Sequence, residues 1–340
     1  MTNVTLGRTG IVAQKNGFGA LPIQRISKEA AVALLRRARA GGINYFDTAR
    51  SYTDSEEKLG AAFGGAWDGI YVASKTPSLT AEGFWNDLET SLSLLKTDVI
   101  DVYQFHNPPF CPKPGDGTGL YEAMTQARAQ GKIRFIGITN HRLDVAREAI
   151  LSGLYDTLQF PFSYLSGEAE KALVYLCRER NVGFIAMKAL SGGLITHSDA
   201  AYAALAEYDS VLPIWGVQRE AELDEFLSYV ACPPSITPEL QAIIDDDRKA
   251  LTGEFCRGCG YCMPCPQGIE INTCARASLL LRRAPTSILL SPEGEQKMMK
   301  INDCLECGKC ASKCPYGLDT PALLKRNLKD YLEVKAGKPL

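Results

Sequence analysis

The 340-residue sequence has no long apolar run and no excess of one charge. None of its apolar runs approaches the roughly 20 residues that a membrane-spanning helix needs. A formal net charge of −2, from 37 basic and 39 acidic side chains, gives no electrostatic case for binding nucleic acid or an anionic membrane. The first five residues, MTNVT, lack the charged and then apolar layout of a secretory signal. We therefore expect a cytoplasmic protein that binds no nucleic acid and has no membrane span.

Cysteine, by contrast, is abundant and unevenly distributed. Of the 12 cysteines, nine fall between Cys256 and Cys314, and only three lie in the first 250 residues. A secreted disulfide scaffold would be small and would carry a signal, so clustered cysteines in a reducing compartment are better explained by metal. The change in composition near residue 250 predicts two domains, residues 1–250 and 251–340.

The first domain alternates short apolar runs with segments of helical length. One helix is predicted after Ser27, which can cap it, and ends at Gly41-Gly42. Residues 4–16 indicate a hairpin ahead of the repeating pattern. Eight such strand–helix units in about 210 residues indicate a closed parallel barrel, although an open doubly wound sheet has the same local pattern. The predicted strands are Gly17–Ala20, Ile43–Asp47, Ile70–Lys75, Val99–Phe105, Ile133–Thr139, Thr157–Phe160, Val182–Met187 and Val211–Val217.

Polar residues at the strand ends separate these two folds. An open nucleotide-binding sheet should carry Gly-x-Gly-x-x-Gly after its first strand, but residues 17–22 read GFGALP and lead into no helix start. A barrel instead gathers reactive side chains at the C-terminal ends of several strands. Three consecutive strands end in this way, in Asp47 (with Tyr52 after it), Lys75 and His106. The sequence therefore favours the barrel.

These four side chains suit the reduction of a carbonyl. Hydride addition leaves an alkoxide that needs a proton, and a tyrosine, with a pKa of about 10, becomes a useful acid beside a cation. Lys75 could supply the cation, and Asp47 could keep Lys75 charged and oriented. His106 could donate a hydrogen bond to the carbonyl oxygen. The alternative is a structural Asp47–Lys75 ion pair beside a core histidine and a packed tyrosine.

The same residues resemble the catalytic tetrad of the aldo/keto reductase family. Neighbouring stretches agree, namely LGRTG at 6–10, GGINYFDTA at 41–49 and GKIRFIGITN at 131–140, and the resemblance extends from about residue 4 to 230. It implies an α/β fold, a (β/α)8 TIM barrel, that binds NAD(P)(H) across its mouth. It also implies an oxidoreductase that reversibly reduces a carbonyl to an alcohol, with Tyr52 as general acid.

The resemblance further assigns the nucleotide contacts. Thr139, Asn140 and Gln159 would hold the nicotinamide carboxamide. Met187 stands where family members often place an aromatic residue against the ring, and a thioether can pack there instead. An ordinary glycine turn is the alternative for the residues expected to line the pyrophosphate, which are Leu190, Ser191 and Gly192.

Nucleotide choice depends on the residues after the last strand. NADPH-specific members carry a basic residue near Gly216 and an arginine where Glu222 aligns. A carboxylate at that position would repel a 2′-phosphate and could accept hydrogen bonds from ribose hydroxyls, whereas Arg219 acts in the opposite sense. We expect NADH rather than NADPH. An apolar or aromatic carbonyl substrate is indicated by the candidate pocket walls Leu21, Ile23, Tyr52, Trp85, Phe105 and Phe110.

The C-terminal cysteines form two runs of four, each ending in Cys-Pro. The second run has the spacing of bacterial ferredoxins, and the first differs by one residue before its last cysteine. In paired runs the last cysteine binds the other cluster. A four-cysteine zinc site is the alternative, but it uses two CxxC pairs rather than runs of four. The predicted ligands are Cys256, Cys259, Cys262 and Cys314 for one [4Fe–4S] cluster, and Cys304, Cys307, Cys310 and Cys265 for a second.

Helical stretches at 275–283 and 318–332 predict a small, mainly α-helical, ferredoxin-like iron–sulfur domain, with Cys274 as a buried thiol rather than a ligand. The clusters could pass electrons to a partner protein, sense redox state or brace the fold. A second hypothesis is therefore an electron-transfer or redox-sensing protein whose barrel binds nucleotide without turnover. A third is a structural protein braced by zinc.

Overall fold

A computed structural model describes residues 3–251, 255–283 and 286–339. The chain forms two compact units. The first consists of Met1–Ala189 and Asp199–Leu240, and the second of Leu190–Ser198 and Gln241–Leu340. The units thus divide near residue 240, and the second includes a short segment from the middle of the chain. The domain boundary at residue 250 stays a prediction.

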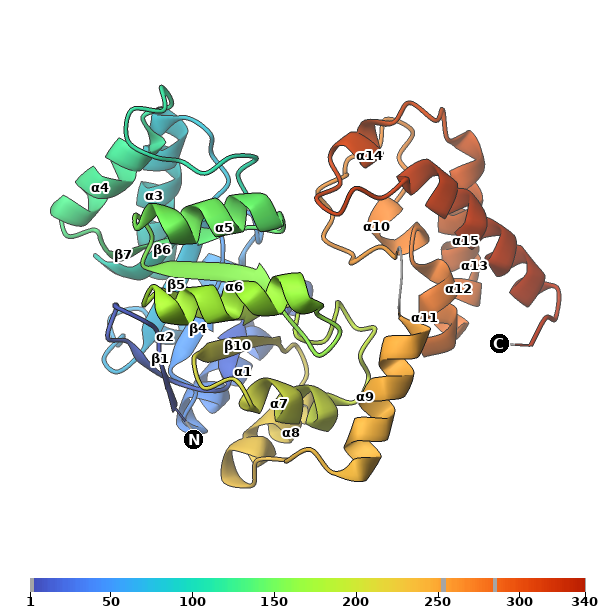
Figure 1. Ribbon diagram of the computed structural model, residues 1–340, viewed down its shortest axis with the longest axis horizontal. Coiled ribbons are helices and arrows are strands. Elements are labelled where there is room, and N and C mark those ends of the chain that lie inside the picture. Colours follow the sequence, from blue (N-terminus) through green and yellow to red (C-terminus); the bar gives the residue numbers. More distant parts are fainter. Residues whose placement is uncertain (1–2, 252–254, 284–285, 340) are drawn as a thin grey trace. The chain divides into compact units, whose positions relative to one another are not determined.

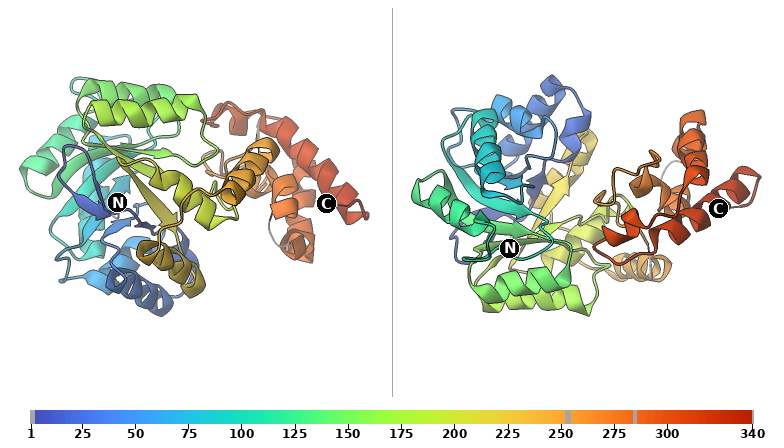
Figure 2. Two further views of the ribbon diagram at one scale, coloured as in Figure 1. Left: turned by 60° about the horizontal axis from the view of Figure 1, so that its bottom comes forward. Right: turned by 90° about the horizontal axis from the view of Figure 1, so that it is seen from above.

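The first unit is a closed barrel of eight parallel strands with helices around it, which confirms the predicted (β/α)8 fold (Figures 1 and 2). The strands follow in chain order, and the last pairs with the first. The barrel strands are β3 (Gly17–Gly19), β4 (Tyr45–Asp47), β5 (Tyr71–Thr76), β6 (Ile100–His106), β7 (Ile133–Thr139), β8 (Thr157–Pro161), β9 (Gly183–Met187) and β10 (Val211–Gly216). The helices are η1 (Pro22–Arg25), α1 (Lys28–Ala40), α2 (Ser55–Phe63), α3 (Ala81–Leu95), α4 (Leu120–Ala129), α5 (Leu143–Ser152), α6 (Glu168–Glu179), α7 (Ser198–Ala206) and α8 (Glu220–Ala231).

Helix α1 shows how the sequence pattern produces these elements. The Ser27 hydroxyl accepts a hydrogen bond from the Ala30 amide at 3.2 Å, which satisfies one of the first unpaired N–H groups of the helix. Its apolar residues recur at helical spacing, so they form one stripe that is buried against the barrel. The buried residues of the stripe are Ala31, Leu34, Leu35 and Ala38.

A hairpin of β1 (Asn3–Thr5) and β2 (Val12–Gln14) contributes to the core of the barrel. Val4, Leu6 and Ile11 are almost fully buried, in one cluster with inward-facing barrel residues. Gly7, at φ +49°, bridges to Val182 just before β9, and a Cβ at Gly7 would lie 2.5 Å from the Gly183 amide nitrogen. The hairpin therefore approaches the N-terminal end of β9, which leaves the C-terminal strand ends for chemistry.

The regular structure in the described part of the second unit is helical, and loops connect its helices. Its core contains Ile269, Met298, Leu324 and Tyr331, together with Cys256 and Cys310. The predicted helices appear as α11 and α15. Its helices are α9 (Pro238–Ala250), α10 (Ile271–Cys274), α11 (Ala277–Arg283), α12 (Thr286–Leu290), α13 (Pro292–Met299), η2 (Lys300–Asp303), α14 (Lys309–Ser312) and α15 (Thr320–Lys335).

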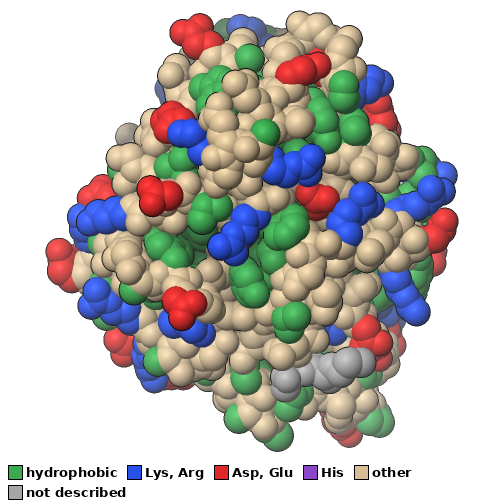
Figure 3. Space-filling view, turned by 90° about the vertical axis from the view of Figure 1, so that its left-hand side faces the viewer, with side chains coloured by type: hydrophobic (Ala, Val, Ile, Leu, Met, Phe, Trp, Pro, Cys, Tyr) green, Lys and Arg blue, Asp and Glu red, His purple; other side chains and the backbone are tan. Residues whose placement is uncertain are grey.

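Surface charge is mixed on the face shown in Figure 3. Lysine and arginine side chains there are interspersed with aspartate and glutamate. Across the parts of the chain that are described, every helix is too short or too polar to cross a membrane.

Candidate active site and cysteine cavities

Asp47 and Lys75 form a buried ion pair at the C-terminal ends of β4 and β5. Lys75 Nζ lies 2.6 Å from Asp47 Oδ2 and donates a second hydrogen bond, also 2.6 Å long, to the Thr48 carbonyl. Both charged side chains are at most 2% exposed. Burial raises the pKa of Asp47 and lowers the pKa of Lys75, and the charge of each partner opposes the shift of the other. The short contact between them favours the ionised pair.

Tyr52 and His106 lie beside this pair. The Lys75 ammonium is 5.1 Å from the centre of the Tyr52 ring, and the Tyr52 and His106 rings meet edge to face with centroids 5.8 Å apart. The structure thus brings together the four side chains that the sequence analysis singled out as catalytic. They come from two strand ends, one strand–helix loop and the last residue of β6.

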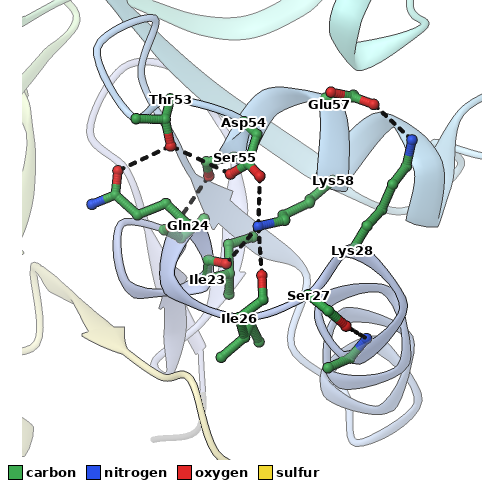
Figure 4. Close-up of polar contacts among 12 residues, drawn as sticks. Ile23, Gln24, Ile26, Ser27, Lys28, Thr53, Asp54, Ser55, Glu57 and Lys58 are labelled. Atoms are coloured by element: carbon green, nitrogen blue, oxygen red, sulfur yellow. Dashed lines mark hydrogen bonds and ion pairs between the residues drawn. The ribbon is translucent and has the colours of Figure 1, made fainter.

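Helix α2 begins three residues after Tyr52, and polar side chains of its first turns, Ser55 and Lys58, bond to the segment after β3 (Figure 4). Ser55 donates from its hydroxyl to the Ala20 carbonyl at 2.9 Å. Lys58, buried and paired with Asp54, donates to the Ile23 and Ile26 carbonyls at 3.0 and 2.7 Å. These bonds tie the loop after β3 to the helix after Tyr52, so the tyrosine sits on a fixed support.

His106 remains neutral at physiological pH. Burial, followed by the positive charges of Lys75 and Lys188, lowers the pKa of His106 to about 3. A neutral imidazole can donate one hydrogen bond from one ring nitrogen and accept one at the other. The side chain is therefore suited to orienting a carbonyl oxygen and not to serving as the main acid.

Gln104 is a site residue that the sequence analysis missed. It is the register partner of Lys75, and its amide donates to Gln159 Oε1 at 2.9 Å. Weaker contacts of 3.5 and 3.4 Å join the Gln104 and Gln159 amide nitrogens to the Asp47 carboxylate. The alternation of side chains along a strand could have identified Gln104, since it lies two residues before His106 and so faces the same side of the strand.

The predicted carboxamide-binding residues lie on adjacent strands, with Thr139 the register partner of both His106 and Gln159. Asn140 already accepts hydrogen bonds from the amides of His141 and Arg142 and donates one to the Pro108 carbonyl. It therefore retains at most one donor for a ligand. Met187 packs within the barrel core, with its sulfur 3.7 Å from the Thr139 hydroxyl.

The other predicted nucleotide contacts lie in three places. Leu190, Ser191 and Gly192 form a turn that belongs to the second compact unit. Gly216 ends β10 and is exposed. At the start of α8, Glu222 accepts hydrogen bonds from the Gln218 and Arg219 amides and pairs with the Arg219 guanidinium at 2.6 Å. The two residues expected to act in opposite senses on a 2′-phosphate therefore bind each other.

Two of the candidate pocket walls are core residues. Ile23 and Phe105 are at most 1% exposed, and the Phe105 ring packs against Phe84 and Tyr155. Trp85 also packs edge to face on Phe84. Their apolar character serves packing, so Ile23 and Phe105 offer almost no surface to a substrate.

The eight cysteines of the two runs line two cavities in the second unit. The first cavity is lined by Cys256, Cys259, Cys262 and Cys314, and the second by Cys265, Cys304, Cys307 and Cys310, with Cys262 also at its wall. The Gly258 amide donates to Cys256 Sγ at 3.3 Å. Among the described side chains, no three His, Cys, Asp or Glu residues converge closely enough to hold one metal ion.

Cys274 lies apart from both sets. It is fully buried, and its thiol donates to the Lys297 carbonyl at 3.5 Å. Burial raises the pKa of Cys274 to about 11, so the side chain stays a protonated thiol at neutral pH.

Comparisons with known proteins agree with both halves of this description. Residues 15–207 match the model of the aldo/keto reductase family, and residues 255–319 match that of a 4Fe-4S dicluster domain. L-galactose dehydrogenase of Arabidopsis thaliana is 30% identical over 210 residues, which cover 56% of this chain and 66% of that enzyme. The NADH-specific methylglyoxal reductase of Escherichia coli is 26% identical over 221 residues, which cover 57% of this chain and 67% of that enzyme. The chain thus spans about two thirds of these relatives' length.

Solved structures show the same fold. An aldo-keto reductase from Bacillus halodurans in its holo form superposes with a TM-score of 0.65 at 20% identity, covering 75% of this chain and 98% of that one. An aldo/keto reductase from Klebsiella pneumoniae in complex with NADP and acetate has a TM-score of 0.59 at 23% identity, covering 72% and 94%. The chain therefore belongs to the aldo/keto reductase family of oxidoreductases and carries a C-terminal 4Fe-4S dicluster domain.

Proposed function

We propose that this protein is an NAD(P)H-dependent reductase of a small carbonyl compound, acting reversibly on the corresponding alcohol. The observation that carries the proposal is the buried Lys75–Asp47 ion pair beside Tyr52 and His106. An ion pair costs desolvation energy when it is buried, and this one lies next to a potential proton donor. That is the placement a catalytic acid requires.

The bound nicotinamide would supply a hydride, that is one proton and two electrons, to the carbonyl carbon. The carbonyl π pair then becomes an oxygen lone pair, which takes the Tyr52 hydroxyl proton. Lys75 stabilises the resulting tyrosinate, Asp47 keeps Lys75 charged, and solvent returns the proton to Tyr52. His106, neutral beside Tyr52, orients the carbonyl oxygen by a hydrogen bond.

The residues present fit a nicotinamide carboxamide. Gln159 uses one oxygen lone pair on Gln104 and one amide hydrogen on Asp47, which leaves one donor and one acceptor. Asn140 retains one donor by the same count. A carboxamide needs both a donor and an acceptor, so the two side chains suffice to hold it.

Direct transfer of labelled hydrogen tests this function. We expect that anaerobic incubation of 4-deuterated NADH with aromatic aldehydes or methylglyoxal gives an alcohol with one deuterium on the carbinol carbon, measured by mass spectrometry. Each 4-deuterated epimer is assayed separately, because the fixed geometry should transfer the label from one of them. Oxidation of the nucleotide with loss of the label to water would instead indicate that the electrons pass through the clusters. Nucleotide binding with no oxidation would favour the second function, an electron-transfer or redox-sensing protein.

NADH is the proposed nucleotide. Glu222 places a carboxylate at the start of α8 and neutralises Arg219, the nearby cation that could bind a 2′-phosphate. One curated relative is described as NADH-specific. Both points favour a nucleotide without the extra phosphate.

Removing the Glu222 charge should shift this preference. In Glu222→Gln, which keeps an acceptor for the helix-capping amides, Arg219 becomes available to a 2′-phosphate. We expect the ratio of kcat/KM for NADPH over NADH to rise roughly tenfold, the effect of one charge-assisted hydrogen bond. Glu225→Gln on the same helix is the control and should leave the ratio unchanged. An NADPH preference in the wild type would refute the NADH proposal, and an unchanged ratio in Glu222→Gln would refute the role of Glu222.

We also propose that the two cysteine cavities hold two [4Fe–4S] clusters, with the ligands assigned from the sequence. Each corner of a cubane takes its own thiolate, so cysteines spread around a cavity fit it, whereas a single zinc ion needs four sulfurs about 2.3 Å from one point. The Gly258 amide that donates to Cys256 is the kind of hydrogen bond that tunes such clusters. An electron-transfer partner, and a cytoplasmic setting, remain predictions.

A further inference from the structure

The segment Leu190–Ser198 follows strand β9 of the barrel, yet it packs with the cysteine-rich part of the chain. The family resemblance predicts that its first residues, Leu190, Ser191 and Gly192, line the nucleotide pyrophosphate. Leu194 and Ile195 are buried, and the turn before them has two consecutive glycines at positive φ, Gly192 and Gly193. A nucleotide-binding turn and a cluster-binding region thus belong to one compact unit.

Arg276 contacts both this turn and the cysteine-rich region. Its Nη1 donates to the Gly192 carbonyl at 2.9 Å, and its Nε donates to the Asn272 carbonyl at 3.0 Å. Arg276 follows helix α10 and lies two residues after the buried Cys274, outside both sets of predicted ligands. Its guanidinium donates to two backbone carbonyls, and the sequence predicts no ligand role for this residue.

The loop between Cys256 and Cys259 lies against the Arg276 guanidinium. A Cβ on Gly258 would lie 2.8 Å from Arg276 Cζ, and a Cβ on Gly192 would lie 2.8 Å from Arg276 Nη1. Both positions favour glycine because their φ angles are positive, +68° at Gly192 and +64° at Gly258, and a side chain at either one would make the guanidinium shift. Gly258 is also the residue whose amide donates to Cys256 Sγ. Gly258 thus donates its amide to a predicted cluster ligand and leaves the space where its side chain would stand to Arg276.

A second arginine holds the end of the same segment. Arg283 Nη1 donates to the Leu194 carbonyl at 3.1 Å and pairs with Asp247 at 2.6 Å. Both side chains of this pair are largely buried, so the bond is shielded from solvent. Arg276 and Arg283 thus bind two carbonyls of one turn, Gly192 and Leu194, whose own backbone bonds run from the Gly193 and Ile195 amides to the Leu190 carbonyl.

We propose that Arg276 is a positioning residue that couples cluster binding at Cys256 and Cys259 to nucleotide binding by the turn at Gly192. The inference rests on the proposed function, since the turn must contact nucleotide. A bound cluster fixes the loop around Gly258 and so confines the guanidinium, which then holds the Gly192 carbonyl. Without iron the loop gains freedom, and nucleotide binding must supply the cost of ordering the turn. Because coupling is reciprocal, bound nucleotide should also stabilise the cluster.

The test measures both directions of this coupling. We expect NADH to bind the iron-loaded wild type at least about fivefold more tightly than the iron-free protein, by fluorescence titration under anaerobic conditions, within the usual range of such couplings. Saturating NADH should slow the release of iron to a chelator by a similar factor. In Arg276→Met, with full iron content, NADH should bind several-fold more weakly, and it should no longer slow iron release.

Two further variants keep the result interpretable. Arg282 lies on α11 next to Arg283, and its guanidinium pairs with Asp330 of α15. Arg282→Met is therefore the matched control and should behave as the wild type. Arg276→Lys retains the charge without the planar fork and should show intermediate coupling if the methionine variant fails to fold. Wild-type coupling that persists in Arg276→Met or Arg276→Lys would overturn the proposal. So would weaker binding that is equal with and without iron, because it would make Arg276 a direct phosphate contact. Failure of wild-type protein to bind either NADH or NADPH would instead refute the proposed function.

Discussion

Replacing Tyr52 by phenylalanine is expected to lower kcat for carbonyl reduction about a thousandfold, since a positioned general acid contributes roughly 10²- to 10⁴-fold. The substitution removes the only proton that the side chain can give. The ring remains next to Lys75 and His106, so the support from α2 and the packing against His106 should persist. The Kd for NADH should therefore change less than about twofold, because Tyr52 is not among the residues proposed to hold the nucleotide.

The control for this experiment is the same substitution at a tyrosine outside the site. Tyr71 begins β5 at the opposite end of the strand from Lys75, so Tyr71→Phe should keep wild-type kcat. Anaerobic assays with the carbonyl panel measure both variants. Near-wild-type turnover in Tyr52→Phe would mean that another group protonates the alkoxide. In that case the Lys75–Asp47 pair would be structural.

Loss of one cluster ligand is expected to have the second largest effect. Cys310 is almost buried and forms part of the core of the second unit as well as one cavity wall. We expect Cys310→Ala to lower the iron content from about eight atoms per chain to about four, the content of one [4Fe–4S] cluster. Because cluster binding and folding of a small domain are linked, the second unit should also become more sensitive to protease.

Cys274→Ala provides the matched comparison. It removes a buried thiol from the same core, but that thiol donates to a backbone carbonyl and lines neither cavity. We expect full iron content and an unchanged visible absorbance of the clusters in this variant, with only a modest loss of stability. Equal loss of iron from both variants would show that packing rather than ligation accounts for the effect. Zinc in place of iron in metal analysis of the wild type, purified anaerobically, would refute the cluster proposal.

Much of the barrel was predictable because its signals are local. The strands are apolar runs with polar residues at their ends, and their bounds in the structure lie within two residues of those predicted. The sequence could predict that Asp47, Lys75 and His106 converge, because all parallel strands of a barrel end at the same rim. Gln104 was missed because it lies inside an apolar run and carries no motif. Ile23 and Phe105 were misassigned to the pocket because an apolar side chain on a loop or strand end can face either the core or a ligand.

The sequence by itself determined the chemistry available to this protein, because side-chain type and spacing along the chain decide which acids, cations and thiolates exist and which share a strand end or a loop. Only the tertiary structure decided which hydrogen bonds and ion pairs those groups form. Asn140 donates to the Pro108 carbonyl, Gln104 and Gln159 contact the Asp47 carboxylate, and Arg276 joins the Gly192 turn to the Gly258 loop across 84 and 18 residues of sequence. The physical reason is that a hydrogen bond or an ion pair depends on distances of a few ångströms in space, and a local sequence pattern cannot encode contacts between segments far apart in the chain.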